Sequence, residues 1–293
     1  MEALLEWNRS TFVNVSLAAS LALFFSSSFS SYISTSASPS PLVNCRSSEG
    51  RKFLFKAMSG PQCCENPPTL DPSCGAGHVE QLCGLNTYIV GSQDSKLAIL
   101  LLSDIFGYEA PNFRKIADKV AAAGFYVVVP DYFNGDTFVL DNPERPLMVW
   151  MKDHGTDKGF EDTKPIIQAL KSKGISKIGA AGFCWGAKVA TELAKCELIQ
   201  AAVMLHPAFV TLDDIKGVKV PTAVLAAEND HLTPLELVKQ FEEELAAKPE
   251  VDGFVKIYPK TSHGWTTRYK AEDEAAAMEA HSDMIQWVVK YVK

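Results

Sequence analysis

Three residues in the second half of the 293-residue chain have the side-chain types that nucleophilic catalysis requires. Cys184 lies between two glycines in the stretch AAGFCWGAKVA, where an apolar run gives way to a helix-like run. Asp230 ends the run PTAVLAAEND, and His263 follows the run GFVKIYP. A thiol needs a base to hold its proton, and an imidazole needs a carboxylate to fix its tautomer. The pattern therefore predicts a Cys–His–Asp triad.

The glycines around Cys184 form the pattern G-x-C-x-G, which is typical of a sharp strand-to-helix turn that presents a nucleophile. Glycine is needed there because strand and helix pass close together. The turn also places the cysteine at a helix N-terminus, whose partial positive charge favours the thiolate. We expect the backbone N–H of Trp185 and an N–H near Ile105 to form the oxyanion hole.

Each of these residues also has an ordinary structural explanation. Cysteines are often buried for structural reasons alone, and Cys196 is an example because nothing reactive lies near it in the sequence. An aspartate at the end of a strand is often only a helix cap. The chain order nucleophile, acid, histidine, with each residue after a predicted strand, favours the triad.

The elements that must position these residues alternate along the chain from about Thr87. Predicted strands are KLAILLLSD, GFYVVVPD, SKIGAAG, AAVMLH, PTAVLAAEND and GFVKIYP, and predicted helices cover residues 110–124, 163–172, 186–193, 234–246 and about 271–291. Short apolar strands separated by amphipathic helices indicate an α/β fold, with a mostly parallel, doubly wound sheet and helices on both faces. In such sheets, active groups lie at the carboxyl ends of the strands.

The composition divides the chain into three parts. Residues 1–57 are rich in serine and poor in acidic residues, which predicts an N-terminal extension that is a targeting or disordered segment. We favour a transit peptide for a plastid, with a cytoplasmic form as the alternative; Glu2 and Glu6 before the apolar run argue against secretion. We expect residues 58–85 to form a cysteine-containing arm and residues 86–293 to form the α/β domain.

Charge and motif content limit the possible partners. The net charge is −7 without a dense basic cluster, so we expect no nucleic-acid partner. The N-terminal apolar run is too short for stable membrane insertion. Neither metal-ligand spacing nor a phosphate-binding glycine loop is present in the sequence, so we expect no metal and no cofactor. The prediction is a monomer or weak dimer that acts on a small-molecule carbonyl substrate.

The residues from 79 to 293 resemble the dienelactone hydrolase family, the cysteine-nucleophile branch of the α/β-hydrolase fold. The segments that carry the resemblance are SDIFGY (103–108), GFYVVVPDYF (124–133), GFCWGA (182–187), ENDHLTP (228–234) and HGW (263–265). Together with MSGPQCCENPP, they are similar to a plant subgroup that carries the label endo-1,3;1,4-β-D-glucanase.

The resemblance implies that Cys184, Asp230 and His263 are catalytic. It also implies an acidic residue at the end of the strand before the oxyanion turn, a glutamate in the family, which helps to convert the resting thiol to a thiolate. Asp104 occupies that position here and is one methylene shorter. The alternative explanation for Asp104 is a polar strand end that faces solvent.

Substrate contacts are predicted around the same edge of the sheet. The family's dienelactone-cleaving members hold the substrate carboxylate with arginines, and Arg268 and Arg145 are candidates here, each with a solvated surface arginine as the alternative. Trp265 is a candidate for an apolar pocket wall, with ordinary core packing as its alternative. The aromatic, proline-punctuated segment 131–155 is expected to be a lid or pocket wall that sets substrate size.

Three functions from different classes fit these features. The first is hydrolysis of a small lactone, ester or thioester through a cysteinyl acyl-enzyme, as expected of a carboxylic ester hydrolase. The second is β-glucan hydrolysis, as the plant label suggests, although that chemistry needs two carboxyl groups beside the sugar and Asp230 is committed to His263. The third is a non-catalytic binder or a thiol redox sensor.

Overall fold

The computed structural model describes residues 66–293. The predicted N-terminal extension, residues 1–57, and the start of the predicted arm lie outside the described residues. Among the residues described, no helix is long and apolar enough to cross a membrane.

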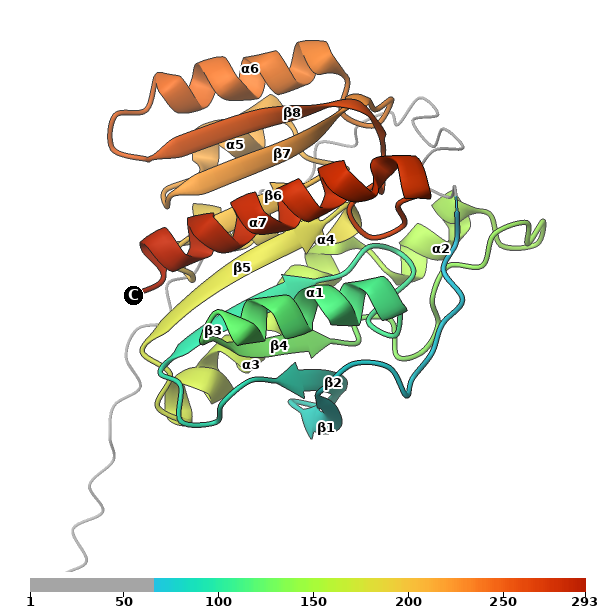
Figure 1. The fold of residues 1–293 in the computed structure, drawn as a ribbon, viewed down its shortest axis with the longest axis vertical. Helices are drawn as coiled ribbons and strands as arrows, with labels where there is room; N and C mark the ends of the chain where they lie inside the picture. Colours follow the sequence, from blue (N-terminus) through green and yellow to red (C-terminus); the bar gives the residue numbers. More distant parts are fainter. Residues whose placement is uncertain (1–65) are drawn as a thin grey trace, which may run out of the picture. The chain divides into compact units, whose positions relative to one another are not determined.

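An eight-stranded sheet forms the centre of the fold, in the order β1-β2-β4-β3-β5-β6-β7-β8 (Figure 1). The strands are β1 (His78–Leu82), β2 (Leu85–Val90), β3 (Leu97–Leu102), β4 (Tyr126–Pro130), β5 (Lys177–Phe183), β6 (Ala202–Leu205), β7 (Thr222–Asn229) and β8 (Gly253–Ser262). All neighbouring pairs from β4 to β8 are parallel, whereas β1–β2 and β2–β4 are antiparallel. The predicted mostly parallel α/β sheet is therefore confirmed.

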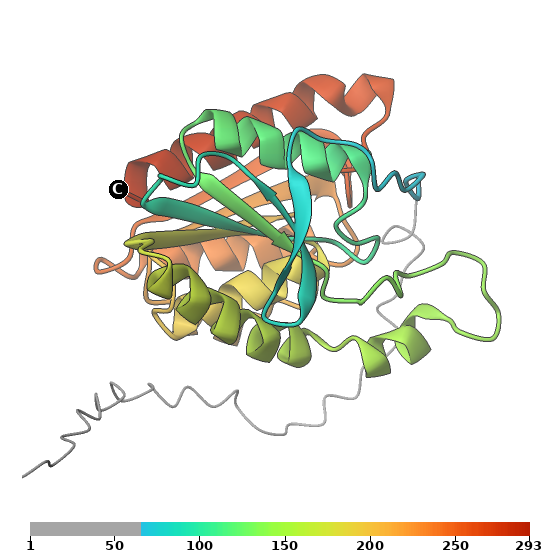
Figure 2. The same cartoon turned by 90° about the horizontal axis from the view of Figure 1, so that it is seen from below.

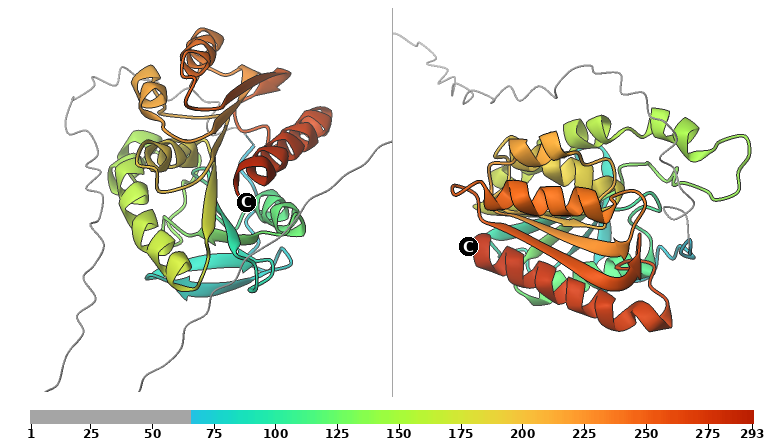
Figure 3. Two further views of the ribbon diagram at one scale, coloured as in Figure 1. Left: turned by 90° about the vertical axis from the view of Figure 1, so that its left-hand side faces the viewer. Right: turned by 90° about the horizontal axis from the view of Figure 1, so that it is seen from above.

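The helices cover both faces of the sheet. They are α1 (Pro111–Ala122), α2 (Leu147–Asp153), α3 (Thr156–Ser172), α4 (Trp185–Lys195), α5 (Leu212–Gly217), α6 (Leu235–Ala246) and α7 (Glu274–Tyr291), the last preceded by a 3₁₀ turn (Ala271–Asp273). Figure 3 shows α1 and α7 on one face, and α3, α4, α5 and α6 on the other. The buried residues form two apolar clusters, one on each face. Parallel strands with both faces covered must be apolar throughout, and this explains runs such as LAILLL in β3.

The structure differs from the sequence prediction mainly in short elements. The antiparallel hairpin of β1 and β2, the helices α2 and α5, and the first two turns of α3 are not among the predicted elements. Helix α5 has only six residues, too few to show a helical period, and starts with a capping box between Thr211 and Asp214. Strand β1 lies in the segment predicted as an arm, and its exposed residues pair only with β2.

Arg114 of α1 holds the chain before β1 against the domain. Its Nη1 donates to the carbonyl oxygens of Pro72 and Cys74, at 2.7 and 3.0 Å. Its guanidinium also lies over the rings of Tyr88 and Tyr108, at 4.6 and 5.2 Å from their centroids. Burying this cation is tolerated because carbonyl groups and aromatic faces replace water around it.

The segment between β4 and α3, which carries α2, extends past the carboxyl end of the sheet (Figure 2). An aromatic cluster anchors it: the Phe133 ring lies 4.8 Å from Trp150 and 5.0 Å from Trp185, between ring centroids. The indole Nε1 of Trp185 donates to the carbonyl oxygen of His154 at 2.8 Å. The segment is thus tied directly to the first turn of α4.

Candidate active site

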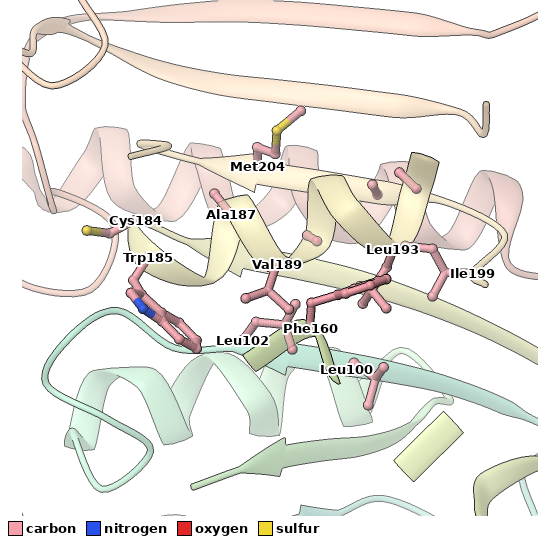
Figure 4. Close-up of a cluster of buried hydrophobic side chains, with 14 of the residues drawn as sticks. Leu100, Leu102, Phe160, Cys184, Trp185, Ala187, Val189, Leu193, Ile199 and Met204 are labelled. Atoms are coloured by element: carbon pink, nitrogen blue, oxygen red, sulfur yellow. The ribbon is translucent and has the colours of Figure 1, made fainter. Parts of the chain in front are cut away.

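Cys184 occupies a strained turn between β5 and α4. Its φ of 51° and ψ of −107° lie in a region that non-glycine residues rarely adopt. Its N–H donates to the carbonyl oxygen of Leu205, and its own carbonyl accepts from the N–H of Ala187, both at 3.1 Å. Figure 4 shows Cys184 and Trp185 at the start of α4, with the sulfur pointing away from the helix. The strained strand-to-helix turn that the sequence predicts is therefore present at Cys184.

The two glycines of this turn, Gly182 and Gly186, are required for steric reasons. A Cβ on Gly182 would lie 2.2 Å from the carbonyl oxygen of Gly186, and a Cβ on Gly186 would lie 2.1 Å from that of Leu102. Both distances are far shorter than any real contact, and both partners are backbone atoms. The strand, the helix and β3 approach so closely that only glycine fits.

Asp230 and His263 form a buried hydrogen-bonded pair. Asp230 Oδ2 lies 2.7 Å from His263 Nδ1, and the two side chains are 2 % and 0 % exposed. Asp230 Oδ1 accepts from the N–H of Leu232 at 2.8 Å, which fixes the carboxylate in its loop. A register shift between Ala227 and Asn229 marks an irregular end of β7 just before the aspartate. An ionised carboxylate only accepts hydrogen bonds, so with Asp230 charged the donor in this pair is His263 Nδ1.

The sheet topology brings the three predicted triad residues to one edge. Cys184 follows β5, Asp230 follows β7 and His263 follows β8, in a sheet whose order there is β5-β6-β7-β8. The carboxyl ends of these parallel strands all lie at the same edge. The segment after β6 contacts the turn of Cys184, because the N–H of Ala208 donates to the carbonyl oxygen of Cys184 at 3.1 Å.

The turn predicted to supply the oxyanion hole lies beside the nucleophile turn. The N–H of Gly186 donates to the carbonyl oxygen of Ser103 at 3.1 Å, which joins the end of β3 to the first turn of α4. Ile105 and Trp185 are both buried, and the carbonyl oxygen of Ile105 accepts from the N–H of Phe138 at 3.0 Å. The two candidate donors therefore come from adjoining turns.

Asp104 is buried, so its alternative explanation as a solvent-facing strand end does not apply. Its Oδ1 accepts from the N–H of Phe106 at 3.0 Å, while Oδ2 accepts from Thr267 Oγ1 at 3.0 Å. Arg268 Nε lies 3.4 Å from the same Oδ2. The structure thus pairs two residues that the sequence predicts separately, one as the acid near the thiol and one as a substrate contact.

Arg268 is not a solvated surface arginine, because its side chain is only 2 % exposed. Its guanidinium lies over the ring of Phe106, 4.9 Å from the centroid. A Cβ on Gly264 would lie 2.1 Å from a guanidinium nitrogen, so the glycine after His263 leaves the space that Arg268 fills.

The other two predicted substrate contacts have different surroundings. Arg145 lies in the segment between β4 and α3, where its Nη1 donates to Asp136 at 2.6 Å and its Nη2 donates to Asp153 at 2.8 Å. Trp265 packs in the apolar cluster on the α1 and α7 face, with its ring 5.2 Å from that of Tyr258, between centroids. Arg145 is thus held by two carboxylates, and Trp265 has the surroundings of a core residue.

One residue of this edge is not among the sequence predictions. His206 directly follows β6, is fully buried, and lies with its ring centroid 5.0 Å from that of His263. Its position after a predicted strand and before Pro207 is the signal that could have identified it. Within residues 66–293, no group of three or more His, Cys, Asp and Glu side chains is arranged to hold a metal ion.

Comparisons with known proteins identify the family of the chain. Residues 85–292 match the dienelactone hydrolase family. A maize protein named endo-1,3;1,4-beta-D-glucanase is 41% identical over 65% of this chain, but the match spans only 63% of the maize protein. A carboxymethylenebutenolidase homolog from Xenopus tropicalis is 32% identical over 67% of this chain and 82% of its own.

Solved structures share the fold at low sequence identity. A dienelactone hydrolase from Anabaena variabilis superposes with a TM-score of 0.55 at 16% identity, covering 78% of this chain and 100% of its own. That likeness concerns the fold alone, whereas the family match covers most of the chain and includes the turn around Cys184. The chain belongs to the dienelactone hydrolase family and has its α/β-hydrolase fold.

Proposed function

We propose that this protein is a carboxylic ester hydrolase that cleaves a small lactone, ester or thioester through a cysteinyl acyl-enzyme. The observation that carries the proposal is the buried 2.7 Å hydrogen bond between His263 and Asp230, at the strand edge where Cys184 occupies its strained turn. A buried carboxylate bonded to Nδ1 leaves Nε2 as the nitrogen that exchanges a proton.

In the proposed reaction, the Cys184 thiolate attacks the carbonyl carbon while His263 holds the thiol proton. The backbone N–H groups of Ile105 and Trp185 stabilise the oxyanion. The tetrahedral intermediate collapses, His263 gives its proton to the leaving oxygen or sulfur, and a thioester remains on Cys184. Water then attacks that thioester and loses a proton to His263, which returns it to the thiolate.

Asp104 and Arg268 have supporting roles in this proposal. Arg268 is the candidate for a carboxylate on the substrate, since a guanidinium binds carboxylates through two parallel hydrogen bonds. In the structure it lies 3.4 Å from Asp104, so an incoming carboxylate would compete with that residue. Release of Asp104 from Arg268 is our proposed route by which it could affect the thiol of Cys184. Arg145 and Trp265 remain weaker candidates because their contacts lie within the protein.

The test is hydrolysis of p-nitrophenyl acetate and a panel of small lactones by the wild type and by Cys184→Ala and Cys184→Ser. We expect the alanine variant to lose the triad's contribution, about 10³-fold or more in kcat/KM. We also expect mass spectrometry to find an acyl adduct on the peptide that contains residue 184 in the wild type only. A folded wild-type protein that neither turns over these substrates nor forms an adduct would contradict the proposal.

β-Glucan hydrolysis is the second candidate, because the maize relative carries that name. Glycoside hydrolysis ordinarily uses two carboxyl groups about 5–10 Å apart beside the sugar. Here Asp230 is hydrogen-bonded to His263, and Asp104 is hydrogen-bonded to Thr267 and ion-paired with Arg268, so both of these acids already have partners. Release of reducing sugar from mixed-linkage glucan that survives alkylation of Cys184 would favour this second candidate.

A further inference from the structure

We propose that His206 is a positioning residue that sets the orientation of the His263 imidazole. The proposal rests on the function proposed above. His206 comes directly after β6, which lies between β5, the strand before Cys184, and β7, the strand before Asp230. Its ring meets that of His263 edge to face, with centroids 5.0 Å apart and planes inclined by 72°.

Three contacts link His206 to the loop that carries His263. Besides the ring contact, His206 Nε2 lies 2.8 Å from the hydroxyl Oγ1 of Thr266, three residues after His263 in the chain. The His206 ring also contacts the rings of Phe183 and Trp265, with centroids 6.0 and 5.5 Å away. The ring is thus enclosed, and any tilt of it would move the loop around His263.

The two residues after His206 contact the loops of the other triad members. The carbonyl oxygen of Pro207 accepts from Thr233 Oγ1 at 2.6 Å, and the N–H of Thr233 donates to Asp230 Oδ1 at 3.3 Å. The N–H of Ala208 donates to the carbonyl oxygen of Cys184 at 3.1 Å. One short segment therefore touches the nucleophile turn, the loop of the acid and the loop of the histidine.

The backbone of His206 is strained, which indicates that its surroundings hold it in place. Its φ of 35° lies in the left-handed region, where non-glycine residues are uncommon. Such conformations persist only where neighbouring structure over-determines them, and they cluster at functional sites. Cys184, whose carbonyl oxygen accepts from Ala208, also has a positive φ, of 51°, and so does Phe209, with a φ of 62°.

His206 remains neutral when His263 takes up a proton. Burial first, and then the nearby charges of His263, Arg268 and His281, lower the pKa of His206 well below its usual range. Its Nδ1 is buried and meets no hydrogen-bond partner within the described part of the chain, so a second ring proton would be left unsatisfied there. A neutral ring can support the His263 imidazolium without placing a like charge beside it.

The proposal is tested with two variants that remove the same hydrogen bond from opposite sides. His206→Phe keeps an aromatic ring against His263 but loses the bond to Thr266, and Thr266→Val removes the hydroxyl. We expect kcat per titrated thiol to fall about 10- to 100-fold in each, because small misplacements of a catalytic group are costly. KM should change less than about threefold. The double variant should resemble a single one, since both changes remove one bond.

A second measurement does not depend on turnover. The Nδ1 proton of His263, bonded to Asp230, should give a downfield imidazole NMR signal that exchanges slowly with water. We expect this exchange to be faster in His206→Phe and in Thr266→Val. If the wild type hydrolyses no ester, the proposed function fails, whereas the exchange comparison still decides whether His206 positions His263.

Thr191→Val is the matched control. Thr191 Oγ1 is buried in α4 and donates to the carbonyl oxygen of Ala187 at 2.7 Å, so its loss also removes one buried hydroxyl bond. We expect Thr191→Val to lose about as much stability as the two test variants. Its kcat per titrated thiol and the exchange rate of its His263 Nδ1 proton should match those of the wild type. If His206→Phe and Thr266→Val both keep kcat within about twofold of the wild type and show an unchanged exchange rate, the proposal is overturned.

Discussion

At the scale of single residues, a severe steric constraint lies at the glycines around Cys184. A methyl group on Gly186 would meet the backbone carbonyl of Leu102 at 2.1 Å, and backbone cannot move aside as a flexible side chain can. We expect Gly186→Ala to lower the free energy of unfolding by about 3 kcal/mol, which corresponds to a fall of about 6–12 °C in the melting temperature. Calorimetry and ester hydrolysis check this together, because a displaced turn should also lose activity.

Gly217→Ala, at the end of α5, is the control for this prediction. Its Cβ would meet only side-chain carbons of Lys195, at 3.1 Å and beyond, and these can move. We expect its stability to stay within about 0.5 kcal/mol of the wild type. Equal melting temperatures for the two glycine variants would mean that the turn tolerates a side chain, contrary to the geometry.

At the scale of elements, Asp136 makes several contacts within the segment between β4 and α3. Asp136 accepts from Arg145 Nη1 at 2.6 Å and lies 2.8 Å from His154 Nε2, while its carbonyl oxygen accepts from Trp150 Nε1 at 2.9 Å. Hydrogen bonds from Arg145 and His154 hold the pKa of Asp136 below its usual range. Asp136 therefore stays charged. Its carboxylate holds Arg145, which precedes α2, and His154, which follows α2, close to the start of the segment.

Removal of the Asp136 carboxylate should loosen the segment between β4 and α3 without unfolding the domain. We expect Asp136→Ala and Arg145→Ala to speed protease cleavage within residues 137–147, with Glu144→Ala, which replaces an exposed neighbour, unchanged. Because Arg145 is bonded to Asp136 and Asp153, we expect Arg145→Ala to change kcat/KM equally for neutral and anionic esters. A selective loss with anionic esters would instead assign Arg145 to the substrate.

Elements with long, regular patterns could be predicted from the sequence, and short ones could not. The apolar runs before Asp104, Cys184 and Asp230 marked strands, and the predicted fold class and family are confirmed. Helices α2 and α5 were missed because six or seven residues give too little period. The position of a residue after a strand predicts the edge it reaches but not its partners. The family resemblance placed Asp104 and Arg268 near the site without revealing that they pair, and nothing in the sequence indicated the contact between His206 and His263.

At the scale of the whole molecule, a partly buried ion-pair network joins neighbouring elements of one helix layer. Asp214 Oδ1, at the start of α5, lies 2.7 Å from Lys188 Nζ and 3.0 Å from Lys195 Nζ, both on α4. Burial alone would raise the pKa of Asp214, but Lys188, the N–H of Thr211 and Lys195 outweigh it and lower the pKa to about 2. The carboxylate is thus more acidic in the folded than in the unfolded chain.

This difference predicts how the stability of the domain depends on pH. A group whose pKa falls on folding stabilises the folded state above its unfolded pKa of 3.8, and that contribution disappears as the pH falls toward the folded value of about 2. A shift of this size corresponds to about 2 kcal/mol at neutral pH. We expect Asp214→Asn to be less stable than the wild type by about that amount at pH 7, with the difference in stability closing between pH 4 and pH 2.

Asp213→Asn is the control, because this neighbouring side chain is 84 % exposed and pairs with Lys216 at 3.4 Å. Urea unfolding at a series of pH values measures both variants, and a gap for Asp214→Asn that persists unchanged at pH 2 would show that packing, rather than charge, accounts for its effect.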